Sequence, residues 1–402
     1  MSAGGWSTPR LDRLRETMAG DVRRGEIPGR VWLVSRRGEV HVDAVGTLTA
    51  GGGAPIHHDT IFRIASLTKP VTAAATLILV EECKLRLDEP VDRLLPELAG
   101  RQVLRRLDGP LDDTVPARRP ISVRDLLTLR LGFGYPMTAA THWPILVAAR
   151  ERGFLLGPPH PQSVVPPDEW LRRFAELPLL HQPGERWMYD LGLDVLGVLI
   201  ARAAGQPFPD FLRERLFEPL GMKDTGFSVP EADLDRLPGC YEADAETGAL
   251  AVYDPPGAAS EWSRPPAFPS GAGGLVSTAD DYHAFCRMLL NRGRHGRLRI
   301  LSRPAVELMT ADHLTAEQRT GMDVFFGDWS SWGFGLSVFT RRDELAMNVG
   351  TFGWTGGLGT SGYTDPREEL IGILLTQRLM GSPVSPPVFR DFWTSAYQAI
   401  DD

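Results

Sequence analysis

The chain has 402 residues, of which 43% are hydrophobic, and a formal net charge of −8. This length and composition indicate a globular protein with a large core, built as two lobes or as one domain with an insertion. The negative charge argues against nucleic acid or an anionic membrane surface as the main partner, because phosphate groups favour a basic field.

The sequence contains no apolar run of roughly 18 residues or more, the length that a membrane-spanning helix needs. Residues 1–13 lack the apolar core of a secretory signal. We therefore expect a cytoplasmic protein without a membrane partner. The sequence is compatible with a homo-oligomer. The three cysteines, Cys83, Cys240 and Cys286, have no metal-ligand spacing and are expected to be reduced core thiols.

Residues 9–24 form an amphipathic pattern that predicts a helix, and residues 29–45 alternate around a turn at 35–38, as in a β-hairpin. A loop is expected at 51–60. A helix that is apolar almost all round begins near Ser66. Further helices are predicted at 91–98, 122–129, 167–176, 191–204, 208–217 and 278–290, with long loops at 134–167 and 253–274.

Three strands, at 332–340, 345–349 and 369–377, and a closing helix at 387–400 complete the pattern. Strands at both ends with helices between them predict an α/β (α+β) fold in which one antiparallel sheet is built from both termini. We assign residues 1–64 and 295–402 to this lobe. Residues 65–294 are assigned to an inserted, mainly helical lobe.

Ser66 and Lys69 are the most informative pair in the sequence. Positions i and i+3 share a helix face, so the Lys69 amine can reach the Ser66 hydroxyl and act as its base. The chain has only two other lysines, Lys84 and Lys223, among many arginines. Arginine could not replace Lys69, because a desolvated lysine can be neutral near neutral pH whereas arginine stays charged. A surface lysine beside a serine that caps the helix is the alternative.

Two more segments could complete an acyl-transfer site. Residues 182–192 form a turn that enters a helix and carry the hydroxyl of Tyr189. Residues 353–359 are a glycine-rich strand edge whose backbone N–H groups could approach a substrate closely. Together with Ser66 and Lys69 they would supply a nucleophile, a base, a proton donor and an oxyanion site.

These motifs resemble, in order along nearly the whole chain, the serine β-lactamase and penicillin-binding-protein superfamily. The class C-like branch and the family VIII carboxylesterases are the most similar. The matching segments are 62–69 with Ser-x-x-Lys, 85–95, 121–128, Tyr189 of the Tyr-x-Asn element, 218–225 and 272–280. The resemblance implies a β-lactamase-like fold with catalytic Ser66, Lys69 and Tyr189. The N–H groups of Ser66 and Gly357 would form the oxyanion hole.

The sequence departs from this family at two places. Tyr189 is followed by Asp190 and Leu191, so the asparagine of Tyr-x-Asn is missing. Trp354, Thr355 and Gly356 stand where β-lactamases have Lys-Thr-Gly, so the cation for a substrate carboxylate is absent there. A tryptophan at this position resembles the family VIII esterases and favours a neutral, apolar group.

The predicted function is a serine hydrolase that cleaves carboxylic esters of small or medium acyl groups, without cofactor or metal. Trp354, Thr355 and Gly356, with Trp262, Trp143 and Phe154 from the long loops, are the candidate substrate-binding residues. The alternatives are an acyltransferase on the same three residues, a weak β-lactamase or D-aminopeptidase, and a degenerate binding module.

Two other patterns point to different chemistry. Residues 357–362 match Gly-x-Gly-x-x-Gly, but a strand rather than a helix follows, which disfavours a dinucleotide site. The histidines His57, His58, His160 and His181 show no metal-ligand spacing.

Overall fold

The computed structural model describes residues 3–135, 142–154, 157–244, 246–342 and 344–402. Within these residues the main sheet has seven strands in the order β11-β12-β13-β14-β15-β1-β2. Their bounds are β1 (Gly29–Arg36), β2 (Glu39–Gly46), β11 (Ser330–Trp332), β12 (Ser337–Phe339), β13 (Phe352–Gly356), β14 (Thr360–Asp365) and β15 (Leu370–Thr376). The prediction of one antiparallel sheet from both termini is confirmed, since β1 pairs with β15 on one side and β2 on the other.

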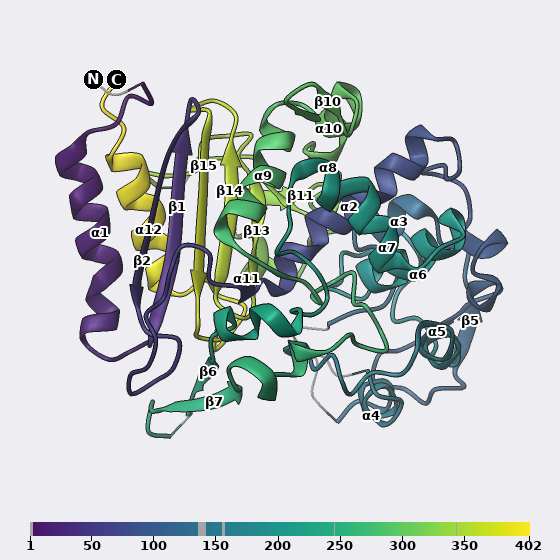
Figure 1. Cartoon of the computed structure of the whole chain (residues 1–402). Coiled ribbons are helices and arrows are strands. Elements are labelled where there is room, and N and C mark those ends of the chain that lie inside the picture. Colours follow the sequence, from purple (N-terminus) through teal and green to yellow (C-terminus); the bar gives the residue numbers. More distant parts are fainter. Residues whose placement is uncertain (1–2, 136–141, 155–156, 245, 343) are drawn as a thin grey trace.

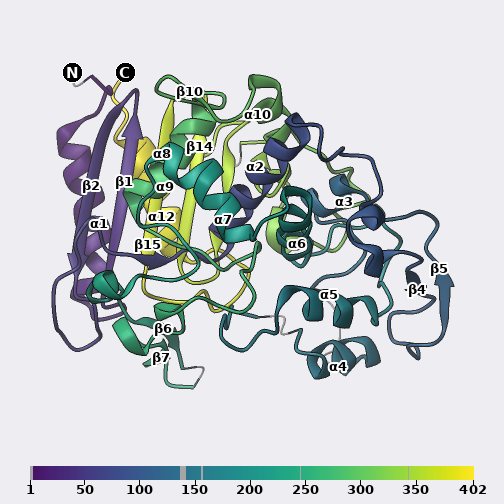
Figure 2. The ribbon, with the colours of Figure 1, turned by 45° about the vertical axis from the view of Figure 1, so that its right-hand side comes forward.

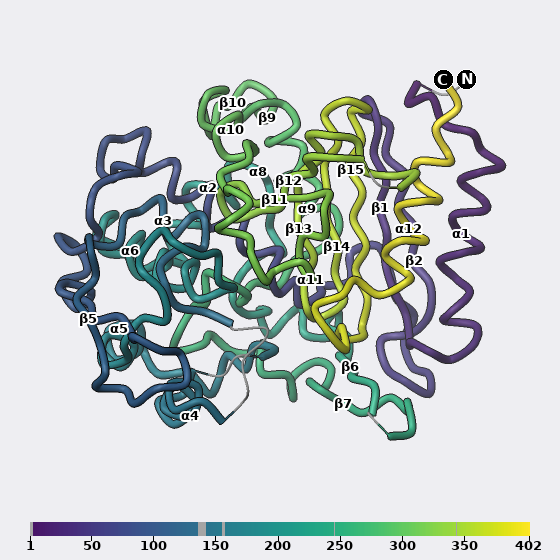
Figure 3. Tube along the Cα trace, turned by 180° about the vertical axis from the view of Figure 1, so that it is seen from behind, coloured from purple at the N-terminus to yellow at the C-terminus, as the bar shows by residue number. Residues whose placement is uncertain are grey.

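Strand β1 is buried at all eight positions because helices cover both faces of the sheet. Helices α1 (Thr8–Arg23) and α12 (Pro387–Gln398) pack on one face, where they bury Trp32 and Val34. Helix α9 (Ala279–Leu290) packs against β1, β14 and β15 on the other face. The two ends of the chain lie side by side at the α1 and α12 edge (Figures 1 and 3).

The helical part lies on the opposite side of the sheet from α1 and α12 (Figure 2). Its helices are α2 (Thr68–Glu81), α3 (Val123–Leu127), α4 (Pro144–Glu151), α5 (Pro167–Ala175), α6 (Gly192–Ala204), α7 (Phe208–Leu212), α8 (Glu218–Leu220), α10 (Arg303–Met309) and α11 (Asp323–Phe326). Short two-stranded sheets pair β3 (Phe62–Arg63) with β8 (Val276–Ser277), β4 (Gln102–Leu104) with β5 (Thr114–Pro116), β6 (Cys240–Ala243) with β7 (Leu250–Asp254), and β9 (Arg294–His295) with β10 (Leu298–Arg299).

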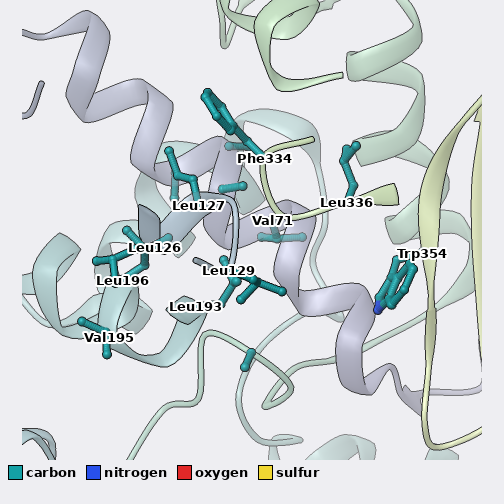
Figure 4. Close-up of a cluster of buried hydrophobic side chains, with 14 of the residues drawn as sticks. Val71, Leu126, Leu127, Leu129, Leu193, Val195, Leu196, Phe334, Leu336 and Trp354 are labelled. Atoms are coloured by element: carbon teal, nitrogen blue, oxygen red, sulfur yellow. The ribbon is translucent and has the colours of Figure 1, made fainter. Parts of the chain in front are cut away.

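Helix α2 is the centre of the molecule, and its first twelve residues, from Thr68 to Leu79, are all buried. Together with α3 and α6 it forms the cluster of buried side chains in Figure 4, which includes Val71, Leu126 and Leu196. Trp354 of β13 lies at the edge of this cluster (Figure 4). The start of α2 is therefore held between the helical core and the sheet.

Most predicted elements are present, and the errors have physical reasons. The predicted strand at 332–340 is two strands, β11 and β12, separated by a turn. The predicted strand at 345–349 is wrong, because Leu345 and Val349 are exposed and the positive φ of Met347, 63°, breaks an extended chain. The segment at 91–98 contains only two single 3-10 turns.

The lobe boundaries at 64/65 and 294/295 stay predictions, although α9 packs on the sheet from within the predicted helical segment. Part of the predicted loop at 134–167 lies outside the described residues, and α4 occupies another part. Among the described residues no helix is long and apolar enough to cross a membrane.

Candidate active site

Ser66 lies in the single 3-10 turn Ala65–Leu67 that leads directly into α2. The preceding Ala65 has a positive φ of 44°, which bends the backbone sharply at the entrance of the helix. The Thr68 hydroxyl fixes this bend by donating to the Ala65 carbonyl at 2.7 Å and accepting from the Leu275 N–H at 3.2 Å. The turn is thereby tied to the chain beside β8, and Ser66 is placed on a cavity wall.

Lys69 follows one turn later and its side chain is completely buried. Its Nζ donates to Ser66 Oγ at 2.9 Å, to the Ala272 carbonyl at 2.7 Å and to Asp190 Oδ2 at 3.3 Å. The predicted contact between amine and hydroxyl is thus present. Each of the three protons of an ammonium group has an acceptor here.

The surroundings of Lys69 act on the pKa of its amine in two opposite directions. Burial lowers the pKa of its amine, as predicted, but neighbouring acidic groups outweigh burial and raise the pKa above its ordinary value. The acidic groups are Tyr189, Asp190 and Asp194. The surroundings of Lys69 therefore favour its ammonium form. The sequence did not show which acidic groups lie beside it.

Tyr189 reaches the same hydroxyl from the segment before α6. Its hydroxyl donates to Ser66 Oγ at 2.7 Å and accepts from Trp354 Nε1 at 2.9 Å. The Lys69 ammonium lies 4.3 Å from the centre of the Tyr189 ring. The Tyr189 hydroxyl links Ser66 to Trp354. Ser66 thus contacts two groups that can exchange protons with it.

The glycine-rich edge of β13 lies against the turn that carries Ser66. A side chain at Gly356 would meet the Ile64 carbonyl at 2.5 Å, so only glycine permits this approach. The Thr360 hydroxyl also donates to the Ile64 carbonyl, at 3.0 Å. Gly357 comes next and lines the cavity with Ser66, and a Cβ there would meet no atom within 4 Å.

The residues from Ser270 to Gly274 form the remaining wall near Lys69. Asp194 Oδ1 accepts from the Ser270 hydroxyl at 2.6 Å and from the Ala272 N–H at 3.1 Å. These bonds hold the Ala272 carbonyl in place as an acceptor for Lys69. Burial, and next the charge of Asp190, raise the pKa of Asp194 to about 6.

The cavity in front of Ser66 has a volume of about 780 Å³. Aromatic side chains line it from two sides. Phe154, Trp170 and Phe268 come from the helical part, and Phe325, Trp329 and Phe339 come from the chain around β11 and β12. Arg390 of α12 also borders the cavity, and its side chain pairs with Glu344 at 2.9 Å.

The predicted substrate-binding residues have different places in the structure. Thr355 and Phe154 line the cavity. Trp354 also lines it, but only 5% of this residue is exposed, and its indole N–H binds Tyr189. Gly356 packs against the turn that carries Ser66.

Trp262 and Trp143 are not among the described residues that line the cavity. Trp262 is buried against other apolar side chains, and its Nε1 donates to the Gly274 carbonyl at 3.0 Å. Trp143 is half-buried at the start of α4. Trp262 is therefore a structural residue, because its indole N–H is already hydrogen-bonded inside the protein.

Sequence reasoning missed Asp190, Asp194, Ala272 and Arg390. Asp190 was noticed only as a departure from a motif, and its contact with Lys69 joins residues 121 positions apart. A local sequence pattern cannot predict a contact between residues so far apart in the chain. Among the described residues no group of three metal-ligating side chains lies together.

A family profile described as Beta-lactamase matches residues 14–386. The chain belongs to the beta-lactamase family. Its relatives in this family include Protein Rv1367c of Mycobacterium tuberculosis, which is 39% identical over 88% of this chain and 86% of that protein. Esterase EstB of Burkholderia gladioli is 32% identical over 88% of this chain and 87% of its own length.

A solved structure of EstCE1, described as a hydrolase with promiscuous acyltransferase activity, has a TM-score of 0.79. It is 26% identical, and the match covers 96% of this chain and 98% of that chain. The predicted beta-lactamase-like fold and family resemblance are therefore confirmed. Esterases and acyltransferases among the family relatives support a serine hydrolase.

Proposed function

We propose that the protein is a carboxylesterase that works through an acyl-enzyme on Ser66. The observation that carries this proposal is the pair of contacts to Ser66 Oγ, 2.7 Å from the Tyr189 hydroxyl and 2.9 Å from Lys69 Nζ. A serine hydroxyl is a weak nucleophile unless a neighbouring base accepts its proton. Both groups lie at hydrogen-bond distance from Ser66 Oγ on the wall of a substrate-sized cavity. Their proposed role is to accept its proton once this couple has lost a proton of its own.

In the proposed reaction, Ser66 Oγ forms a bond to the ester carbonyl carbon and gives its proton to the Lys69–Tyr189 couple. The alcohol leaves with that proton when its bond to carbon breaks. Water then attacks the acyl group, the couple takes a proton from the water, and this proton returns to Ser66 as the acid departs. The N–H groups of Ser66 and Gly357 are the proposed donors to the oxyanion.

The cavity supports esters with a bulky apolar part. Its volume of about 780 Å³ lies in the upper part of the ~300–1,000 Å³ range of ligand sites. Aromatic walls on both sides provide apolar contact area for an acyl group and for an alcohol. The proposed substrates, esters of small or medium acyl groups, therefore leave room for a large alcohol.

An acyltransferase on the same residues is the second candidate. EstCE1 is described as having promiscuous acyltransferase activity, and the free volume beside Ser66 could hold an acceptor alcohol in place of water. The outcome depends on whether the acceptor or water reaches the acyl-enzyme first.

The test is hydrolysis of p-nitrophenyl esters of increasing chain length, beside nitrocefin and with or without a competing alcohol. We expect turnover of neutral esters, far less turnover of nitrocefin, and a fluorophosphonate adduct on Ser66 by intact mass. The Ser66→Ala variant is the control. An unlabelled Ser66, or equal efficiency on nitrocefin, contradicts the proposal. A transfer product in the presence of the alcohol favours the second candidate.

A further inference from the structure

Asp190 is the carboxylate that touches Lys69. Its Oδ2 lies 3.3 Å from Lys69 Nζ, and about a third of its side chain, 34%, is exposed where it lines the cavity. The other acceptors of Lys69, Ser66 Oγ and the Ala272 carbonyl, are neutral. Asp190 therefore supplies the charge that balances the buried ammonium directly.

The other titratable groups around Lys69 are also acids. Tyr189 lies under the ammonium, and Asp194 faces it from α6 while holding the Ala272 backbone. Tyr363 of β14 is buried and interacts electrostatically with Tyr189. Asp194 Oδ1 already accepts from the Ser270 hydroxyl and the Ala272 N–H. Asp190 is thus the carboxylate that pairs directly with Lys69.

We propose that Asp190 is a positioning residue that keeps Lys69 protonated at rest and thereby sets the pH range in which Ser66 becomes a nucleophile. This inference rests on the proposed function. In this role Asp190 controls the protonation of Lys69 and Tyr189 and does not contact the reacting ester.

The direction of the effect is the same whichever group accepts the Ser66 proton. If neutral Lys69 is the base, the Asp190 charge stabilises its inactive, protonated form. If the Tyr189 phenolate is the base, the same charge opposes its formation and offsets the help it receives from Lys69. In both cases the couple loses its proton at a higher pH than it would beside a neutral residue.

Asp190→Asn is the decisive variant, because its amide oxygen can still accept from Lys69 while the charge is removed. The acidic limb of kcat/KM for p-nitrophenyl acetate should move to lower pH by about 1 unit. The rate below the wild-type limb should rise roughly 10-fold. The pH dependence of Ser66 labelling by a fluorophosphonate should shift equally, and this readout needs no turnover.

Asp190→Glu keeps the charge, and Asp12→Asn removes an exposed charge on α1; both should leave the limb where it is in the wild type. The shift should persist when Asp190→Asn is made in an Asp194→Asn background. If it disappears there, the limb belongs to Asp194 and the inference is overturned. Thermal unfolding checks that each variant is folded, and Asp190→Ser replaces Asp190→Asn if the latter is not.

The two levels of failure are distinguishable. If wild-type Ser66 is labelled at no pH and no ester is cleaved, the proposed function fails. If the wild type is active and the Asp190→Asn limb is unmoved or moves to higher pH, the function stands and the role of Asp190 is refuted.

Discussion

Replacing Trp354 with phenylalanine should weaken catalysis through Tyr189 rather than through substrate contact. The indole Nε1 donates to the Tyr189 hydroxyl at 2.9 Å, and the ring packs edge-on against Trp332 at 4.7 Å between centroids. Phenylalanine keeps an aromatic ring in this position but has no N–H donor. Tyr189 then loses a donor that becomes stronger when negative charge develops on its oxygen.

The size of the effect follows from the type of bond. A hydrogen bond to a charged group contributes about 1.5–3 kcal/mol. At about 1.36 kcal/mol per factor of ten, kcat/KM should fall between roughly 10-fold and 150-fold. Most of the loss should appear in kcat, because the bond strengthens as the proton moves and not as the ester binds.

The assay is steady-state hydrolysis of p-nitrophenyl butyrate, with thermal unfolding as a check on folding. Trp332→Phe is the matched control: its Nε1 donates to the Leu127 carbonyl at 3.4 Å, and the residue does not line the cavity. A folded Trp354→Phe enzyme with more than half of the wild-type kcat would refute the reasoning. An equal loss in Trp332→Phe would do the same, because packing alone would then explain it.

Three further predictions concern the same site. Ser66→Ala and Lys69→Ala should each lower esterase turnover by roughly 10³-fold or more, since nucleophile and base act as a unit. Steady-state rates of p-nitrophenyl acetate hydrolysis test this. A Ser66→Ala enzyme that works at the full rate would disprove it. Gly356→Ala should reduce kcat by up to about 100-fold, because the added Cβ pushes β13 away from the turn that carries Ser66. Gly357→Ala is the control and should fold normally, since a Cβ at Gly357 meets open space. Equal thermal stability and equal rates for Gly356→Ala and the wild type would contradict this. Burial, and next the charge of Asp190, raise the pKa of Asp194 to about 6. The contribution of Asp194 to folding stability is therefore complete below the pKa of an unfolded aspartate and is lost as the pH rises through 6. The melting temperature of Asp194→Asn should fall less between pH 4 and pH 7 than that of the wild type.

The sequence predicted those parts of the site that depend on local geometry. Ser66 and Lys69 meet because one helix turn separates them, and this distance is set by the backbone. Tyr189 and Gly357 were found through ordered motifs that resemble a family. The contact of Asp190 with Lys69 and that of Trp354 with Tyr189 were not predicted, because each joins segments more than a hundred residues apart.

The errors also have a common origin. Alternating apolar residues at 345–349 predicted a strand, but alternation does not reveal which face of a segment has a partner to pack against. Trp262 was expected at the substrate because it lies in a long loop, yet its loop folds back and buries it. The three acidic groups that raise the pKa of Lys69 are brought to it only by the tertiary structure.

The pairing of β1 with β15 has a consequence for the order in which the chain folds. Val31 pairs with Leu375, so β1 waits for a partner strand that leaves the ribosome hundreds of residues later. Until then, the inner edge of β1 presents unpaired backbone N–H and C=O groups beside apolar side chains, and nascent chains can associate there. Slow refolding from denaturant and a strong dependence of its yield on protein concentration should follow.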